Sequence, residues 1–266
     1  MVAQTLRNRI LSGDLKDRAE LPKQDELFTE FGVSMPSIRE ALRILETEGL
    51  VTVRRGARGG AVVHHPDPGT AGYILSLMMQ AQAVDVADLA LAVRQMEPLC
   101  AGMCAGRADR AEAVLPALRT VQADAADAFD DFPKFVAMMR LFHETVLQTC
   151  GNGTMTLLIG VLEGIWYTQE AAWATRVYGE VEPPEAKVRY QTLREHDVLI
   201  DAIERGDVDG ATRLARNHLH EAQRYALLDD ATTERRLVDA RLQRPLPGGA
   251  PPPRPARPAP PARDAV

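Results

Sequence analysis

The sequence predicts a mostly α-helical protein: an N-terminal winged helix-turn-helix of three helices and a β-hairpin wing, followed by an antiparallel all-α helical bundle. Residues 1–66 show three short helical runs and then a β-branched hairpin pattern. Residues 69–228 show long helical runs with no strand pattern. Residues 229–266 form a tail that is rich in proline and arginine, and we expect it to be disordered from about residue 244.

Two short helices open the chain. Apolar residues at helical spacing predict a first helix that ends at Gly13, and "LPKQDELFTEFGVS" predicts a second from about Lys23 to Phe31. Gly32 closes this second helix, and the next helix follows after only a tight turn. Two short helices joined in this way are typical of a helix-turn-helix.

The third helix lies in "VSMPSIREALRILETEGLV", residues 33–51. Ser34 is its predicted N-cap, Pro36 falls in the first turn where a missing N–H costs nothing, and Gly49 supplies a left-handed stop. One apolar stripe contains Ile38, Ala41, Leu42 and Leu45. The opposite face carries Ser37, Arg39, Glu40, Arg43 and Glu46. Alone, this pattern describes an ordinary solvated surface helix.

The predicted hairpin joins "LVTVRR" to "GAVVHH" through the glycine-rich "GARGG". It carries Arg54, Arg55 and Arg58 with no acid, and Gly56 allows close approach of a phosphate backbone. A solvated basic hairpin without a ligand is the alternative. The order of helices, the tight turn and the arginine-rich wing together favour DNA binding.

In the bundle region, helical periodicity and capping residues predict seven helices. Their expected spans are 70–81, 85–106, 109–129, 131–149, 154–177, 185–205 and 207–228.

Composition and cysteine content narrow the class of protein. Of the 266 residues, 45% are hydrophobic and 26% charged, as in soluble globular proteins, and the net charge of −6 excludes a molecule that is basic all over. Three cysteines without a CxxC motif argue against a disulfide scaffold or a cysteine zinc site. The sequence has no signal peptide or long apolar run, so it predicts a cytoplasmic protein with no membrane partner.

Three histidines fall on inward faces of different predicted helices: His143, His196 and His218. For each one alone, a hydrogen-bonded core histidine is the simpler interpretation. Three imidazoles that point into one bundle, however, are a common way to hold a transition metal ion.

The residues 21–63, "LPKQDELFTEFGVSMPSIREALRILETEGLVTVRRGARGGAVV", closely resemble the DNA-binding domain of GntR-family bacterial transcription regulators. The helical region resembles the ligand-sensing FCD domain of the FadR subgroup, through "RQMEPLCAGMCAGRA", "LFHETVLQTCGN" and "REHDVLIDAIERGDVDGATRLARNHL". The likeness covers about residues 1–228. It implies a regulator that binds double-stranded operator DNA and a small-molecule effector.

The resemblance assigns the DNA-contacting residues. Arg39 matches a DNA-contacting arginine of the family, and Arg55 with Gly56 matches the wing tip. Members usually have arginine where this chain has Met35, and often where it has Asp25, so we expect altered operator specificity with DNA binding retained. The full set of expected DNA contacts is Ser34, Met35, Ser37, Arg39, Arg43, Arg54, Arg55, Gly56 and Arg58.

The resemblance also implies a metal site. Metal-binding FCD domains have an aspartate four residues before the first histidine, and this chain has Met139 there. The three histidines can still hold Zn²⁺ or Ni²⁺, with water or effector completing the coordination. Glu163 is a candidate substitute for the missing carboxylate. The alternative is that Met139 turns the site into an apolar pocket that binds no metal.

Arg94 is a further candidate, because it shares a helix face with apolar residues. Its inward charge needs a partner, and Glu97 would serve structurally. The family instead places an effector-contacting arginine in this motif, and guanidinium pairs well with carboxylate. The expected effector contacts are therefore Arg94, Met139, His143, His196 and His218. The effector itself would be a carboxylate-bearing metabolite or a bulkier acyl thioester.

The resulting prediction is a ligand-responsive transcription regulator, not an enzyme, that binds an inverted-repeat operator as a homodimer. The alternative is a metal-dependent enzyme that uses the three histidines. Against it, no inward base stands at a defined spacing from them, and the wing arginines would have no role. Loss of Arg39 or Arg55 would affect only the regulator.

Overall fold

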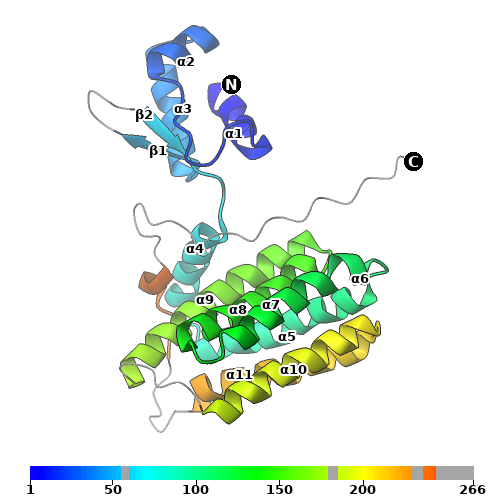
Figure 1. Cartoon of the computed structure of the whole chain (residues 1–266). Coiled ribbons are helices and arrows are strands. Elements are labelled where there is room, and N and C mark those ends of the chain that lie inside the picture. The colour runs from blue at the N-terminus through cyan, green and yellow to red at the C-terminus, as the bar shows by residue number, and fades with distance from the viewer. Residues whose placement is uncertain (55–59, 179–184, 229–235, 244–266) are drawn as a thin grey trace.

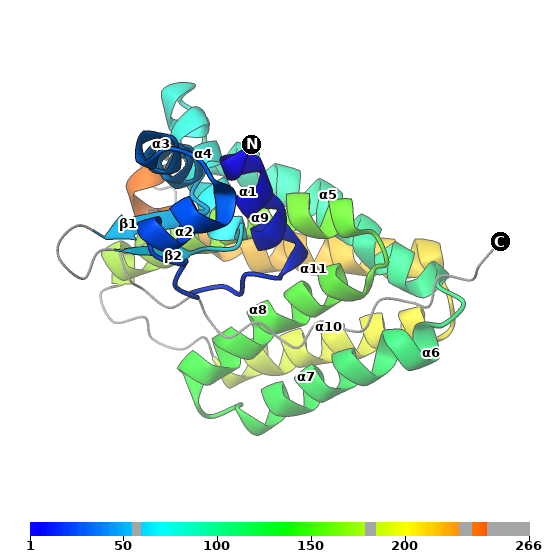
Figure 2. The same ribbon diagram turned by 90° about the horizontal axis from the view of Figure 1, so that it is seen from above.

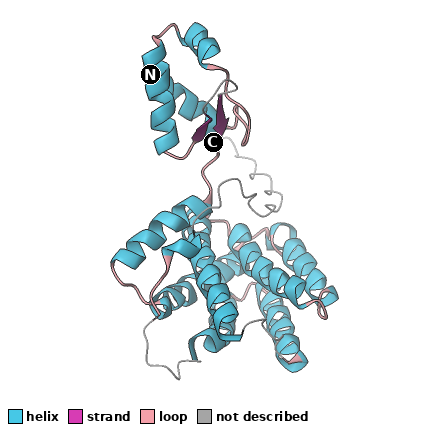
Figure 3. Cartoon of the chain, turned by 90° about the vertical axis from the view of Figure 1, so that its left-hand side faces the viewer, coloured by secondary structure: helices cyan, strands magenta, loops and turns pink. Residues whose placement is uncertain are grey.

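The computed structural model describes residues 1–54, 60–178, 185–228 and 236–243. A small N-terminal lobe stands on a larger helical bundle, and one connecting segment joins them (Figure 1). Strands occur only in the small lobe among the described residues (Figure 3). The mostly helical fold class predicted from the sequence is confirmed.

The N-terminal lobe has the predicted order of three helices and a hairpin: α1 (Val2–Ser12), α2 (Gln24–Phe31), α3 (Met35–Thr47), β1 (Val51–Arg54) and β2 (Gly60–Val63). The strands are antiparallel, with Val51 opposite Val63. Ser34 caps α3 by accepting the Ser37 N–H at 3.4 Å, and Gly49 has the predicted left-handed φ of +74°. Ile38 and Leu45 of α3 are fully buried in the lobe's core. Arg55, Gly56 and Arg58 lie outside the described residues.

The bundle contains α4 (Pro68–Ala81), α5 (Val86–Gly106), α6 (Arg110–Ala113), α7 (Leu115–Asp127), α8 (Phe132–Thr149), α9 (Gly153–Tyr178), α10 (Ala186–Glu204) and α11 (Val208–Leu228). The single helix expected over 109–129 is wrong, because the chain breaks at Val114 and restarts at Leu115. Pro116 explains this break, since it has no N–H to continue the preceding helix. None of the helices in the described residues is both long enough and apolar enough to cross a membrane.

The bundle is built around α5. One apolar cluster joins α5 to α7, α8, α10 and α11, with Phe142 and Ile203 fully buried in it. The helix α7 packs beside α8 and α10, and in the view from above α10 lies between α7 and α11 (Figure 2). The helices α5 and α11 approach so closely that a Cβ on Gly102 would collide with Thr212. This packing fixes the relative positions of the side chains that α8, α10 and α11 direct inward.

Residues 236–243, which we call the C-terminal strap, pack back on the bundle. The Val86 N–H donates to the Arg236 carbonyl at 2.7 Å, and the Val238 N–H donates to the Val84 carbonyl at 3.0 Å. The Val238 side chain is 1% exposed, in a cluster with Trp166 of α9. The sequence pattern did not predict this docking. The part of the tail expected to be disordered, from about residue 244, lies outside the described residues.

Further hydrogen bonds tie the strap to two helices. The Gln169 side chain of α9 bonds both the N–H and the carbonyl of Asp239, at 3.1 and 2.9 Å. The Ala240 N–H donates to Gln80 of α4 at 2.9 Å, and Gln243 donates to the Gly164 carbonyl of α9 at 2.8 Å. The strap therefore holds α4 against α9.

We predict that Val238→Ala lowers the free energy of unfolding of the bundle by about 1–3 kcal/mol, because it removes buried methyl groups and leaves a cavity. Leu237→Ala is the matched control, since Leu237 is 44% exposed and should change stability by much less. Urea unfolding followed by tryptophan fluorescence measures both, because Trp166 lies in the same cluster as Val238. Equal effects of the two substitutions would show that the strap is not docked in solution.

Candidate metal and effector site

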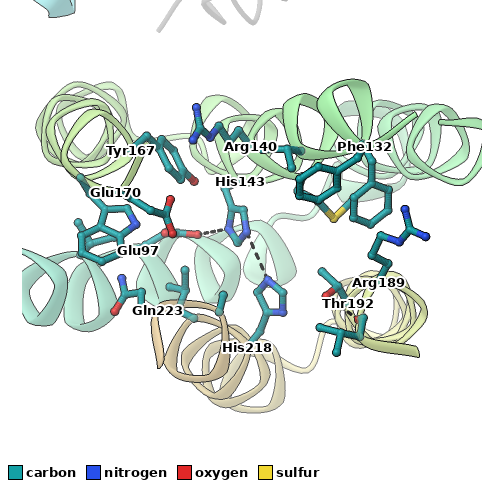
Figure 4. A pocket seen from close by; sticks show the side chains of 18 residues that line it. Glu97, Phe132, Arg140, His143, Tyr167, Glu170, Arg189, Thr192, His218 and Gln223 are labelled. Atoms are coloured by element: carbon teal, nitrogen blue, oxygen red, sulfur yellow. Dashed lines mark hydrogen bonds and ion pairs between the residues drawn. The ribbon is translucent and has the colours of Figure 1, made fainter. Parts of the chain in front are cut away.

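The three predicted histidines converge inside the bundle. His143 lies on α8, His196 on α10 and His218 on α11. The Nε2 atom of His218 is 3.2 Å from that of His196 and 3.3 Å from that of His143. All three rings are largely or fully buried, and their ligand atoms lie within 4.8 Å of one another. We call this group the three-histidine centre; Figure 4 shows two of its members, His143 and His218.

Carboxylates fix two of these rings from behind. The Nδ1 of His143 is 2.6 Å from Glu97 Oε1, and the Nδ1 of His218 is 2.8 Å from Glu195 Oε2. An ionised carboxylate can only accept, so both Nδ1 atoms carry the hydrogen, and in the neutral rings both Nε2 atoms present bare lone pairs. The ring of His196 stacks on Phe142, with centroids 3.7 Å apart and planes within 8°.

The facing nitrogens are a reason to expect a cation. An Nε2–H on His196 can satisfy its contact with His218, but the lone pairs of His143 and His218 then still face each other. In that tautomer the buried Nδ1 of His196 also has no partner. A metal ion removes the repulsion, and nitrogens on a tetrahedral Zn²⁺ with bonds of about 2.0–2.1 Å lie about 3.3–3.4 Å apart. The residues present therefore fit a divalent metal.

Burial favours the neutral form of two of the three imidazoles, which is the form that metal binding requires. It lowers the pKa of His196 well below the ordinary value, and the charges of the other two histidines act in the same direction. Burial also lowers the pKa of His218, although its hydrogen bond to Glu195 works against this. The carboxylates behind the rings hold the ligand atoms in place, as outer-shell partners do at other histidine metal sites.

No protein carboxylate completes the centre among the described residues. Met139 lies one turn before His143 and lines the adjacent cavity, where its thioether is a poor ligand for a hard divalent ion. Glu163 is buried behind Glu97 rather than among the converging ligand atoms. Burial, followed by the charge of Glu97, raises the pKa of Glu163 well above its usual value. This environment makes Glu163 a partner of Glu97 and not the fourth ligand.

A cavity of about 220 Å³ adjoins the centre, and His143 and His218 form part of its lining. Arg140 of α8 and Arg189 of α10 also line it (Figure 4). The structure gives neither guanidinium an ion-pair partner among the described residues. Gln223 of α11 also lines the cavity and is 2% exposed. Both polar atoms of its amide are buried and have no partner in the described chain.

The structure places Arg94 differently from the sequence-based expectation. Its guanidinium donates to His220 Nδ1 at 2.9 Å, and Glu97 bonds His143 instead. Val93 and Glu97 face the interior, and Arg94 is rotated by one residue from Val93 around α5, so it is not among the residues that line the cavity. The spacing in the sequence could have indicated the two arginines that do line it. Arg140 precedes His143 by three residues and Arg189 precedes His196 by seven, which are same-face intervals on a helix.

The second predicted site is the outer face of α3. Ser34, Ser37, Arg39 and Arg43 are exposed there, and Met35 is half-buried. Arg39 contacts Gln24 at the start of α2, with Nε and Oε1 3.5 Å apart. On the wing, the Arg54 side chain is 62% exposed and lies 3.4 Å from Glu20. The exposed arginines of this face and of the wing are accessible to a polyanion.

Family comparisons agree with this arrangement. A model of the bacterial regulatory proteins of the gntR family matches residues 1–63, and a model of the FCD domain matches residues 88–221. The chain belongs to the GntR family and carries an FCD domain. It is a DNA-binding transcription regulator with an effector-sensing domain, in a family of regulators rather than enzymes.

Individual relatives support the same assignment. The HTH-type transcriptional repressors NanR of Salmonella typhimurium and Salmonella typhi are each 27% identical over 226 residues, which cover 83% of this chain and 81% of the relative. The solved structure of Streptococcus agalactiae GntR superposes with a TM-score of 0.63 at 23% identity, over 84% of this chain and 98% of that chain. This structure has the same fold.

We predict that the purified regulator binds one divalent metal ion per chain and that His196→Ala abolishes this binding. His220→Ala is the matched control, because His220 lies on α11 but outside the three-histidine centre. Elemental analysis measures the bound metal, and thermal unfolding with and without chelator measures its effect on stability. Metal at a hundredfold excess over its Kd would stabilise the fold by about 2.7 kcal/mol. Equal metal content in wild type and His196→Ala would contradict the assignment.

Proposed function

We propose that this regulator binds an inverted-repeat operator as a homodimer and that a small carboxylate effector, bound in the cavity beside the three-histidine centre, changes its affinity for DNA. The observation that carries the effector proposal is a cavity next to three converging imidazoles, lined by two arginines that have no ion-pair partner among the described residues. Guanidinium groups recognise carboxylates in a bidentate fork. The relatives are repressors by name, which supports repression as the outcome of operator binding.

His143, His196 and His218 would hold the metal, and we propose Zn²⁺ or Ni²⁺ because imidazole suits both ions. A bound ion would supply Lewis acidity towards an effector oxygen. The size of the cavity favours a small effector. Sites for drug-sized ligands occupy about 300–1,000 Å³, and this cavity has about 220 Å³. A small carboxylate is therefore a better candidate than a whole acyl thioester.

A continuous set of contacts supports a route from the cavity to the DNA-binding lobe. Trp166 lines the cavity and packs in the same cluster as Val238 of the C-terminal strap. The strap hydrogen-bonds Gln80 of α4, and α4 begins at Pro68, five residues after β2 ends at Val63. An effector that moves Trp166 would therefore act on the helix that leads directly to the wing. Such an effector shifts operator affinity only if it binds one arrangement better than the other.

The operator can be found by selecting random DNA duplexes with the purified protein, and a panel of small carboxylates can then be titrated into the metal-loaded complex. We expect selected sites to be inverted repeats with half-sites about one helical turn apart. We also expect at least one carboxylate to change operator affinity about 5- to 150-fold. If no carboxylate changes it, although one binds tightly, the proposed effector response is wrong.

We predict that Arg39→Ala weakens operator binding by roughly 5- to 150-fold, because an arginine that contacts a base contributes about 1–3 kcal/mol. Arg213→Ala is the control, since Arg213 is an exposed arginine of α11 far along the chain from α3. Fluorescence anisotropy with the selected duplex measures both. Equal affinities of the two variants for the duplex would show that Arg39 does not contact the DNA.

We predict that Met35→Arg changes which base is preferred at one position of each half-site, towards guanine. Met35 is the first residue of α3, where the GntR family usually has an arginine, and arginine pairs with guanine through two hydrogen bonds. Repeating the selection with Met35→Arg and with the isosteric control Met35→Leu measures the shift. An unchanged preference in Met35→Arg would show that position 35 does not contact a base.

A further inference from the structure

We infer that the effector carries two anionic groups joined by an apolar spacer, one held at the three-histidine centre beside Arg140 and the other at Arg189. This inference rests on the proposed function and specifies the ligand of the same cavity. Its basis is that two permanent positive charges line one small cavity from different helices and have no ion-pair partner among the described residues. Figure 4 shows the two side chains well apart along the pocket.

The first anionic position lies at the centre itself. Arg140 and His143 share a face of α8, three residues apart. The guanidinium of Arg140 lies over the ring of Tyr167, with Cζ 4.8 Å from the centroid, which orients it without neutralising it. A carboxylate here can contact the imidazole-bound ion and Arg140 together, and it would take the place of the aspartate that Met139 replaces.

The second anionic position lies at Arg189 near the start of α10. Its Nη1 donates to the Phe129 carbonyl at 3.0 Å, and its Cζ lies 4.6 Å from the centre of the Phe129 ring. Its Nε is buried and has no partner in the described part of the chain. The side chain is thus held in one orientation while donors remain unused. This preorganisation lowers the entropic cost of binding an anion.

The distance along α10 and the lining between the two positions define the spacer. Arg189 precedes His196 by seven residues, which is about 10.5 Å along a helix axis. The side chains of Phe132, Phe135, Val136, Met139 and Val188 line the same cavity. These apolar groups would exclude a polar linker, so the two charges of the effector should be separated by a hydrocarbon segment.

The acids that line the cavity form no close ion pair with either arginine among the described residues. Glu97 is already bonded to His143 at 2.6 Å. Glu170 lines the cavity, but burial raises its pKa towards the neutral form, although Arg140 and His143 act in the opposite direction. A monoanionic effector would leave one guanidinium without a counter-charge. A dianion satisfies both.

The competing interpretation is that Arg189 only ties α10 to the turn before α8 through the Phe129 carbonyl. A structural tie would affect stability, but it would not distinguish ligands by their number of charges. The test therefore compares ligands that differ in one charge. Arg194→Gln serves as the matched control for Arg189→Gln, because Arg194 is an exposed arginine of the same helix and does not line the cavity.

The experiment is calorimetric titration of the metal-loaded full chain with straight-chain dicarboxylates of increasing length and with the monocarboxylates of matching length. We expect one dicarboxylate to bind roughly tenfold or more tightly than its matched monocarboxylate. In Arg189→Gln that advantage should disappear while the monocarboxylate affinity is retained, and in Arg194→Gln the advantage should persist. Arg189→Lys keeps the charge without the fork and should show a reduced advantage; it also replaces Arg189→Gln if that variant does not fold.

Two results would overturn the inference: monocarboxylates that bind as tightly as dicarboxylates, or a dicarboxylate advantage that survives Arg189→Gln. The proposed function fails separately. If monocarboxylates bind and alter operator affinity as well as dicarboxylates do, the dianion inference is wrong and the proposed function stands. If dicarboxylates bind through Arg189 and leave operator affinity unchanged, the inference stands and the proposed response is wrong.

Discussion

Three imidazole nitrogens from three different helices meet in the interior of the bundle, and their contact constrains how these helices can pack. The closest Nε2 atoms are 3.2 and 3.3 Å apart, and they belong to α8, α10 and α11. Glu97 and Glu195 fix the hydrogen on Nδ1 of two rings, so their lone pairs point at one another. Repulsion at this point would push three core helices apart, and a shared cation would draw them together. Binding of a metal ion here would therefore be coupled to bundle stability through the same atoms.

This coupling extends beyond the centre because the surrounding packing leaves little room for adjustment. The helices α5 and α11 cross at Gly102, where even a methyl group would collide with Thr212. Glu97, which orients His143, sits on the same helix α5. A shift of His218 with α11 would therefore displace α5. Through the apolar cluster that contains Val86, Val238 and Trp166, the displacement would also reach the C-terminal strap and α4. Close-packed interiors transmit such shifts as movements of whole elements.

Much of the fold follows from local signals in the sequence. Ser34 and Gly49 bound α3 as their capping chemistry predicts, and periodicity alone placed the three histidines on inward faces. Periodicity is informative there because the face of a helix repeats at fixed intervals. Periodicity could not decide whether Arg94 or its neighbour Val93 faces the interior, because the apolar residues around them agree with either orientation of the helix.

The remaining failures have other physical causes. The break at Val114 depends on one proline, Pro116, inside an otherwise helical pattern. The C-terminal strap is held by backbone hydrogen bonds and by one buried side chain, Val238, and such contacts leave no periodic pattern in the sequence. Its docking depends on surfaces of α4, α5 and α9 that only the folded bundle creates.

The replacement of the expected aspartate by Met139 agrees with the arginines that the structure reveals. A protein carboxylate at position 139 would complete the coordination of an ion and also cancel one positive charge. With Met139, the centre lacks an oxygen ligand, and Arg140 and Arg189 have no ion-pair partner among the described residues. An anionic effector would then supply both the missing ligand and the missing charge, so its electrostatic interactions would be stronger in the partly buried cavity than in water. An effector that completes the electrostatics of the core in this way can act as a switch, because only the arrangement that binds it gains the stabilisation.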